Sequence, residues 1–134
     1  VWVELQEDPG LHVPIAGYHI HFWTPDYVEL LDWYSEVFDL NIRPRGRIQT
    51  TTDVPGMNMS FGDAEGPTAP TRGRALDHIG FEVDNLEAFC QKLEAMGIEF
   101  DVTYREVDSV ELKIAFLTDP AGTYIELTEG YDEY

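Results

Sequence analysis

The sequence TDPAGTYIELT, at residues 118–128, decides the fold of this chain. It opens with Asp-Pro-Ala-Gly, in which proline presets φ for a turn and glycine tolerates positive φ. Apolar and polar residues then alternate, which predicts a strand over residues 123–128. Ile125 and Leu127 share one face of this strand, and Glu126 lies on the other face between a phenol and a hydroxyl. A lone strand glutamate is most often solvated, so the rest of the chain must show whether Glu126 has a function.

Two other strand-like segments carry histidine. Residues 75–83 read ALDHIGFEV and include His78. Residues 17–23 read GYHIHFW, in which His19 and His21 share a face because side chains alternate along a strand. Two imidazoles on one strand face are uncommon without a function, so these histidines are candidate site residues.

A helix is expected after each histidine strand. Thr24 as N-cap and Pro25 at the first helical position predict a helix that ends near Phe38. Asp84 and Glu87 predict a capping box for the second helix, and Gly97 predicts where that helix ends. The pattern His-Ile-x-Phe followed by a helix therefore occurs twice.

Three strands are expected after each helix. They span residues 40–45, 47–52 and 57–61 in the first half, and 98–104, 110–117 and 123–128 in the second. The sequence thus predicts an α+β fold in which two βαβββ modules form an open, cup-shaped mixed sheet. We divide a single domain, 1–134, into an N-terminal arm at 1–16, a first module at 17–63, a Gly- and Pro-rich linker at 64–74, a second module at 75–129, and an acidic tail at 130–134 that is expected to fray.

Composition excludes several functions. The formal net charge is −18, which repels nucleic acid and anionic membrane surfaces. No apolar run approaches the roughly 20 residues of a membrane span. The single cysteine, Cys90, has no internal disulfide partner, and its apolar helical position predicts burial. Because the chain begins with Val1 rather than Met, a secreted or periplasmic location stays open beside the cytoplasmic one that we expect.

The segments LDHIGFEVDNLEAF and DPAGTYIEL make the chain resemble the vicinal oxygen chelate (VOC) superfamily. That superfamily includes glyoxalase I, extradiol dioxygenases, methylmalonyl-CoA epimerase, fosfomycin-modifying enzymes and bleomycin-binding proteins. The resemblance covers residues 17–129, and it implies a divalent metal ion at the centre of the cup. It also implies that His19, His78 and Glu126 are the metal ligands, because they occupy the family's ligand positions.

One ligand of the family pattern is missing. The family often has a Glu or Gln on the last strand of the first module, but aligning Gly56 with Gly122 puts Ser60 there. Only a shifted alignment brings Asp63 or Glu65 into that place. The remaining two histidines and one carboxylate are typical of non-haem Fe(II) sites, so Fe(II) is favoured, with Mn(II), Zn(II) and Ni(II) as alternatives.

Two more residues are catalytic candidates. His21 is interpreted in three ways, as an additional ligand, as an acid/base beside the metal, or as a structural histidine bonded to a carbonyl. We favour the acid/base because the repeat already gives the ligand role to His19. Tyr124 shares the face of Glu126, where it would donate a hydrogen bond to an oxyanion or serve only in packing.

These features predict a divalent-metal-dependent enzyme, dioxygenase-like or lyase-like, that chelates vicinal oxygens of a small organic substrate. Two alternatives stay open: a non-catalytic drug-binding protein of the bleomycin-resistance type, and a glyoxalase- or epimerase-like isomerase. A homodimer is expected, because sheet edges and apolar side chains such as Trp2 and Trp33 need cover.

Overall fold

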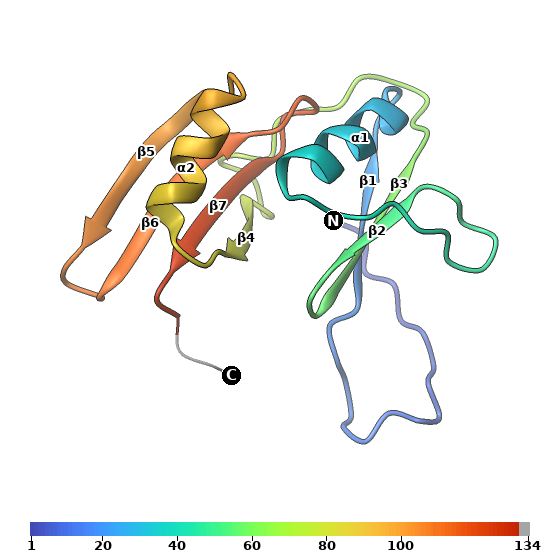
Figure 1. Cartoon of the computed structure of the whole chain (residues 1–134). Coiled ribbons are helices and arrows are strands. Elements are labelled where there is room, and N and C mark those ends of the chain that lie inside the picture. The colour runs from blue at the N-terminus through green and yellow to red at the C-terminus, as the bar shows by residue number, and fades with distance from the viewer. Residues whose placement is uncertain (132–134) are drawn as a thin grey trace. The chain divides into compact units, whose positions relative to one another are not determined.

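The structure is a computed structural model that describes residues 1–131 (Figure 1). The chain divides into two compact units, Val1–Thr68 and Ala69–Tyr134. The end of the tail that is expected to fray, residues 132–134, lies outside the described residues. Neither described helix has the length and apolarity that crossing a membrane requires.

The first unit is a three-stranded mixed sheet with one helix. Its elements are β1 (His19–Trp23), α1 (Tyr27–Val37), β2 (Thr51–Val54) and β3 (Met57–Gly62). The central strand β3 runs parallel to β1 and antiparallel to β2, and α1 packs against β3 and β2. The buried apolar side chains between sheet and helix are Phe22, Leu30, Leu31, Tyr34, Val37, Met59 and Phe61.

The start of α1 differs from the prediction. Thr24 is not the N-cap, because its backbone N–H donates to the Gly62 carbonyl at 3.1 Å and so extends the pairing of β1 with β3. Asp26 takes the N-cap position without a side-chain hydrogen bond. The helical residues end at Val37 with Phe38 as C-cap, as expected.

The predicted strands at 40–45 and 47–52 are wrong except where the second overlaps β2. Between α1 and β2 the chain is irregular, with a single bridge between Arg45 and Ile48. Pro44 has no N–H for a ladder there, and a hydrogen bond of 3.0 Å from Arg43 N to the Thr51 carbonyl ties the segment to the edge of β2. The first unit therefore has the order βαββ.

The second unit has the expected βαβββ order. Its elements are β4 (His78–Glu82), α2 (Leu86–Ala95), β5 (Phe100–Val107), β6 (Leu112–Thr118) and β7 (Tyr124–Glu129). The sheet order is β4-β7-β6-β5, with β4 parallel to β7 and the other neighbours antiparallel. Over residues 1–131, two helices and two mixed sheets confirm the predicted α+β class. The cup expected from pairing the two sheets stays a prediction.

The turn that opens the deciding stretch forms as predicted. The Asp119 carboxylate accepts hydrogen bonds from the N–H groups of Ala121 at 2.9 Å and Thr123 at 2.7 Å. Gly122 has a φ of +91°, and a Cβ there would lie 3.1 Å from Pro70 Cα, so this position needs glycine. The turn thereby fixes where β7 begins.

Both ends of α2 are well defined, although its N-cap was predicted wrongly. Asn85, with a φ of 55°, is the N-cap and accepts a hydrogen bond from Ala88 N, in place of the expected capping box. Gly97, with a φ of 84°, ends the helix as predicted. Cys90 is buried as expected, and burial raises the pKa of its thiol to about 11.

Candidate metal centre

His78 and Glu126 lie next to each other on the polar face of the second sheet. The parallel register pairs His78 with Tyr124 and Gly80 with Glu126. His78 Nε2 is 3.2 Å from Glu126 Oε2. A Cβ at Gly80 would meet no heavy atom within 4 Å, so there is open space beside the glutamate in this unit. Two predicted ligands are therefore already in contact.

The other ring nitrogen of His78 is bound by Asp77, which sequence reasoning missed. His78 Nδ1 is 2.8 Å from Asp77 Oδ1, and the second carboxylate oxygen accepts from Gly73 N. Hydrogen bonds from His78 and then from Gly73 hold the pKa of Asp77 below its usual value. Its position directly before the histidine in LDHIGF was the available signal. The ionised carboxylate therefore fixes the orientation of the His78 ring.

This arrangement fits a metal ion. Metal-binding histidines usually donate their second ring N–H to a carboxylate or carbonyl, as His78 donates to Asp77. In that tautomer the unprotonated Nε2 faces the Glu126 carboxylate, so two lone pairs point toward each other. A proton or a cation must lie between them, and both atoms are ligands that Zn²⁺ and Fe²⁺ accept.

Part of the predicted linker holds this site together. The Thr71 hydroxyl donates to the Asp77 carbonyl at 2.7 Å and accepts a hydrogen bond from Tyr124 N at 2.8 Å. Thr71 N also donates to the Gly122 carbonyl at 2.9 Å. One linker residue thus joins the segment before β4 to the start of β7, and so helps to set the spacing of the candidate ligands.

Tyr124 lies beside the His78 ring, with ring centroids 6.3 Å apart. It is buried, it stacks on Phe116 at 5.0 Å, and the Arg72 guanidinium lies 4.6 Å above its ring. Burial is the main cause that raises the pKa of Tyr124, so the phenol stays protonated at neutral pH. This environment suits both interpretations of the residue, packing and hydrogen-bond donation.

The first unit has a different polar face. Its register pairs His19 with Asn58 and His21 with Ser60, so Ser60 occupies the place that Glu126 has in the second unit. Ser60 is buried, and its hydroxyl donates to Asn58 Oδ1 at 3.1 Å. This hydrogen bond gives Ser60 a structural partner within its own sheet.

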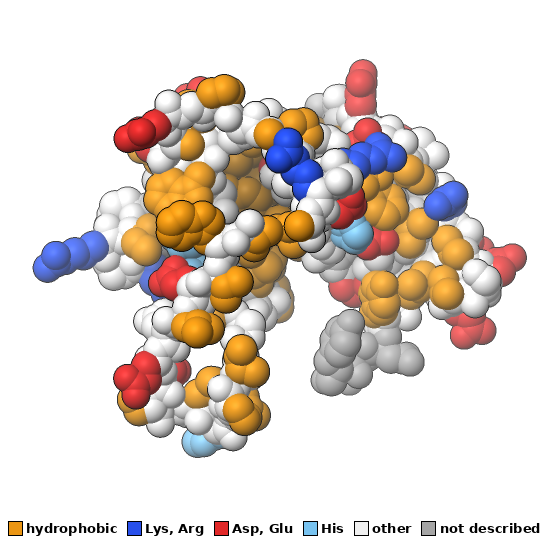
Figure 2. All heavy atoms as spheres, turned by 180° about the vertical axis from the view of Figure 1, so that it is seen from behind, with side chains coloured by type: hydrophobic (Ala, Val, Ile, Leu, Met, Phe, Trp, Pro, Cys, Tyr) orange, Lys and Arg blue, Asp and Glu red, His pale blue; other side chains and the backbone are white. Residues whose placement is uncertain are grey.

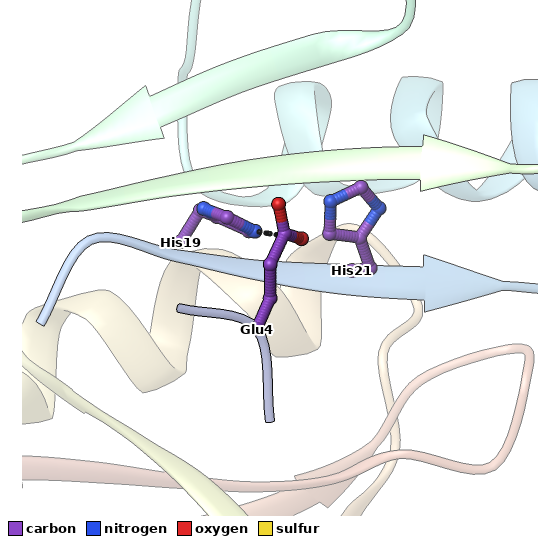
Figure 3. A group of neighbouring side chains, drawn as sticks. All are labelled: Glu4, His19 and His21. Atoms are coloured by element: carbon purple, nitrogen blue, oxygen red, sulfur yellow. Dashed lines mark hydrogen bonds and ion pairs between the residues drawn. The ribbon is translucent and has the colours of Figure 1, made fainter. Parts of the chain in front are cut away.

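A carboxylate nevertheless reaches the histidines of the first unit. Glu4, on the N-terminal arm, has its Oε2 3.3 Å from His19 Nε2. Figure 3 shows the Glu4 carboxylate lying between the rings of His19 and His21, whose centroids are 4.9 Å apart. Sequence reasoning missed Glu4, because it lies 15 positions before His19 in a segment without a motif.

The structure thus brings together His78 and Glu126 in one unit, and His19 and His21 in the other. The convergence of His19 on the pair in the second unit stays a prediction. The catalytic roles of His21 and Tyr124 also stay predictions.

Comparison with known proteins identifies relatives over most of the chain. A family model described as the Glyoxalase/Bleomycin resistance protein/Dioxygenase superfamily matches residues 18–127. The lactoylglutathione lyase of Schizosaccharomyces pombe is 41% identical over 63 residues, which are 46% of this chain and 19% of that protein. The lactoylglutathione lyase of Pseudomonas aeruginosa is 32% identical over 57 residues, which are 42% of this chain and 31% of that protein. The matched part of this chain thus spans less than a third of either lyase.

Among solved structures, the protein described as Oxidase ChaP-H2 is similar to this chain with a TM-score of 0.72. The alignment covers 89% of this chain and 96% of that one at 15% identity, which is a likeness of fold alone. The family match and this shared fold confirm the resemblance drawn from the sequence. The chain belongs to the glyoxalase/bleomycin resistance protein/dioxygenase superfamily.

Proposed function

We propose that this protein is a divalent-metal-dependent enzyme of lyase type that acts on a small organic substrate with two vicinal oxygens. His19, His78 and Glu126 are the proposed ligands. The observation that carries the proposal is the His78 ring, held by Asp77 on one nitrogen and facing Glu126 with the other. Similarity to two lactoylglutathione lyases supports the lyase type.

A bound divalent ion would polarise the substrate oxygens as a Lewis acid. The protein residues have separate tasks. Asp77 holds the His78 ring in one orientation and tautomer, and Glu126 supplies negative charge on a side chain that is only 20% exposed. Tyr124, whose raised pKa keeps its hydroxyl protonated, would donate a hydrogen bond to a substrate oxygen that gains negative charge.

One observation favours dioxygenase-like chemistry as the second candidate. The position equivalent to Glu126 in the first unit carries Ser60, whose hydroxyl already bonds Asn58. A set of two histidines and one carboxylate leaves more open positions than a four-ligand set, and such sites are typical of Fe(II) oxygenases. Metal identity separates the two candidates, because dioxygenase chemistry needs a redox-active ion.

The metal content of the tag-free protein tests the proposal. We expect at least one divalent ion per chain by elemental analysis. Glu126→Ala should weaken metal binding at least a hundredfold by calorimetric titration, because it removes a partly buried charged ligand. Glu99→Ala is the control, since it removes the same charge from an exposed position of the same unit. A metal-free protein that binds a cationic drug would instead favour the bleomycin-resistance type.

The role of Asp77 gives a second prediction. Asp77→Asn keeps the shape of the side chain but removes the charge that holds His78, so metal affinity should fall about 10-fold or more. Asp108→Asn, at an exposed position, should leave the affinity unchanged. Equal affinities for the two variants would show that Asp77 does not position the ligand.

We also propose a homodimer. Trp2, Val3 and Leu5 are between 82% and 101% exposed, and Figure 2 shows further hydrophobic side chains along this arm. Trp33 needs no such cover, because it packs edge-on against Tyr34 within its own unit. Sedimentation at micromolar concentration should give the mass of two chains, and Trp2→Ser should shift the equilibrium toward the monomer. A single-chain mass for the unchanged protein would contradict this proposal.

A further inference from the structure

We infer that Glu4, His19 and His21 bind a divalent cation such as Zn²⁺ or Co²⁺ within the first unit alone. The three side chains each offer one ligand atom, and these atoms all lie within 4.8 Å of one another. All three belong to Val1–Thr68, so this site needs no residue of the second unit, and it shares only His19 with the ligand set of the proposed function.

The distances suit an ion of this class. Zn²⁺ binds histidine nitrogen at about 2.0–2.1 Å and carboxylate oxygen at about 2.0–2.2 Å, so two of its ligands lie roughly 3–4 Å apart. The Glu4 and His19 ligand atoms are already 3.3 Å apart. His21 needs only a small side-chain movement to complete the set, and Figure 3 shows the carboxylate between the two rings.

The two imidazoles are held in place by their neighbours on β1. His19 and His21 share one strand face, and their ring planes make an angle of 74°. The Trp23 ring stacks on His21 with centroids 5.7 Å apart and planes 12° apart. Trp23 in turn lies over Gly62, where a Cβ would be only 2.7 Å from the indole. Trp23 is 58% exposed, but its stacking on His21 and its contact with Gly62 still limit the positions of the His21 ring, which lowers the side-chain entropy that binding would cost.

Comparison of the two registers explains why the arm supplies the carboxylate. The pair Gly80 and Glu126 in the second unit corresponds to His21 and Ser60 in the first. The first unit thus lacks an acid on its last strand but has a second imidazole on its first strand. Glu4 supplies the missing carboxylate from outside the sheet, which gives a two-histidine, one-carboxylate set.

This inference gives His21 a ligand role in place of the acid/base role favoured from the sequence. The family resemblance assigned ligands only to the family's ligand positions, and neither His21 nor Glu4 is such a position. A carboxylate beside both rings is the new observation that makes a ligand the better interpretation.

The test uses the full chain with both second-unit ligands removed, as the double variant His78→Ala/Glu126→Ala. Titration with Co²⁺, followed by visible absorption and calorimetry, should show one equivalent bound, more weakly than by the unchanged protein. In this background Glu4→Gln and His21→Ala should each lower the affinity at least tenfold. The matched controls are Glu7→Gln and His12→Ala, both at exposed arm positions, and they should change nothing.

The controls separate a built site from general attraction to an acidic protein with a net charge of −18. The titration is made at about 0.15 M salt, where charges beyond about 8 Å are screened. Equal losses for Glu4→Gln and Glu7→Gln, or no Co²⁺ binding by the double variant, would overturn the inference and leave the proposed function standing. Unchanged affinity in the double variant would overturn the proposed function and leave this site standing.

A second measurement serves if the double variant does not fold. Co²⁺ added to the otherwise unchanged protein should broaden the ring proton signals of His19 and His21 in the NMR spectrum. Glu4→Gln should require at least ten times more Co²⁺ for the same broadening of His21. Broadening of His21 that Glu4→Gln does not alter would contradict the role of the arm.

Discussion

The contact of His78 with two carboxylates is the interaction on which the candidate site of the second unit depends. Asp77 binds Nδ1, and Glu126 lies 3.2 Å from Nε2. Without a proton or a cation, this ring would place a lone pair against an ionised carboxylate. The parallel pairing of β4 and β7 brings these groups together, and Thr71 bonds the start of both strands. The backbone therefore holds an imidazole nitrogen next to a carboxylate oxygen, and a proton or a cation between them makes this contact favourable.

The two units share the pairing of their first and last strands but differ in the polar side chains that these strands carry. Both pair their first and last strands in parallel, and both carry a histidine at the start of the first strand. The second unit keeps a carboxylate on its last strand, opposite Gly80. The first unit has Ser60 there, bonded to Asn58 in a buried polar network. The first unit instead has an additional imidazole, His21, on its first strand, next to the carboxylate of Glu4 on the N-terminal arm.

The second unit could be predicted well from the sequence because its signals are local. The Asp-Pro-Ala-Gly turn, the alternation in β7 and the stop at Gly97 each depend on residues that are adjacent in the chain. The first unit was predicted less well because tertiary contacts override its local signals. The sequence at Thr24 is typical of an N-cap, but the backbone N–H of Thr24 donates to the Gly62 carbonyl. Residues 40–50 have strand-like composition, yet only one bridge forms there.

The residues of the candidate site could likewise be predicted where the sequence carries a recognisable pattern, and not where tertiary contacts decide. His19, His78 and Glu126 could be selected from the family resemblance, because they occupy the positions of the family's metal ligands. Asp77 and Glu4 were missed, because the adjacency of Asp77 and His78 does not show that their side chains bond, and no motif links Glu4 to β1. The Asp77 carboxylate accepts a hydrogen bond from Gly73 N, which lies four positions earlier in the chain. Glu4 contacts His19, which lies 15 positions later in the chain.

The central claim is that the contacting side chains His78 and Glu126 bind one divalent metal ion. Anomalous diffraction from crystals grown with Zn²⁺ tests it most directly, because it locates the ion without reference to activity. We expect an anomalous peak about 2.0–2.2 Å from His78 Nε2 and from a Glu126 carboxylate oxygen. Crystals in which Zn²⁺ binds elsewhere on the chain, while His78 and Glu126 hold no ion, would contradict the account.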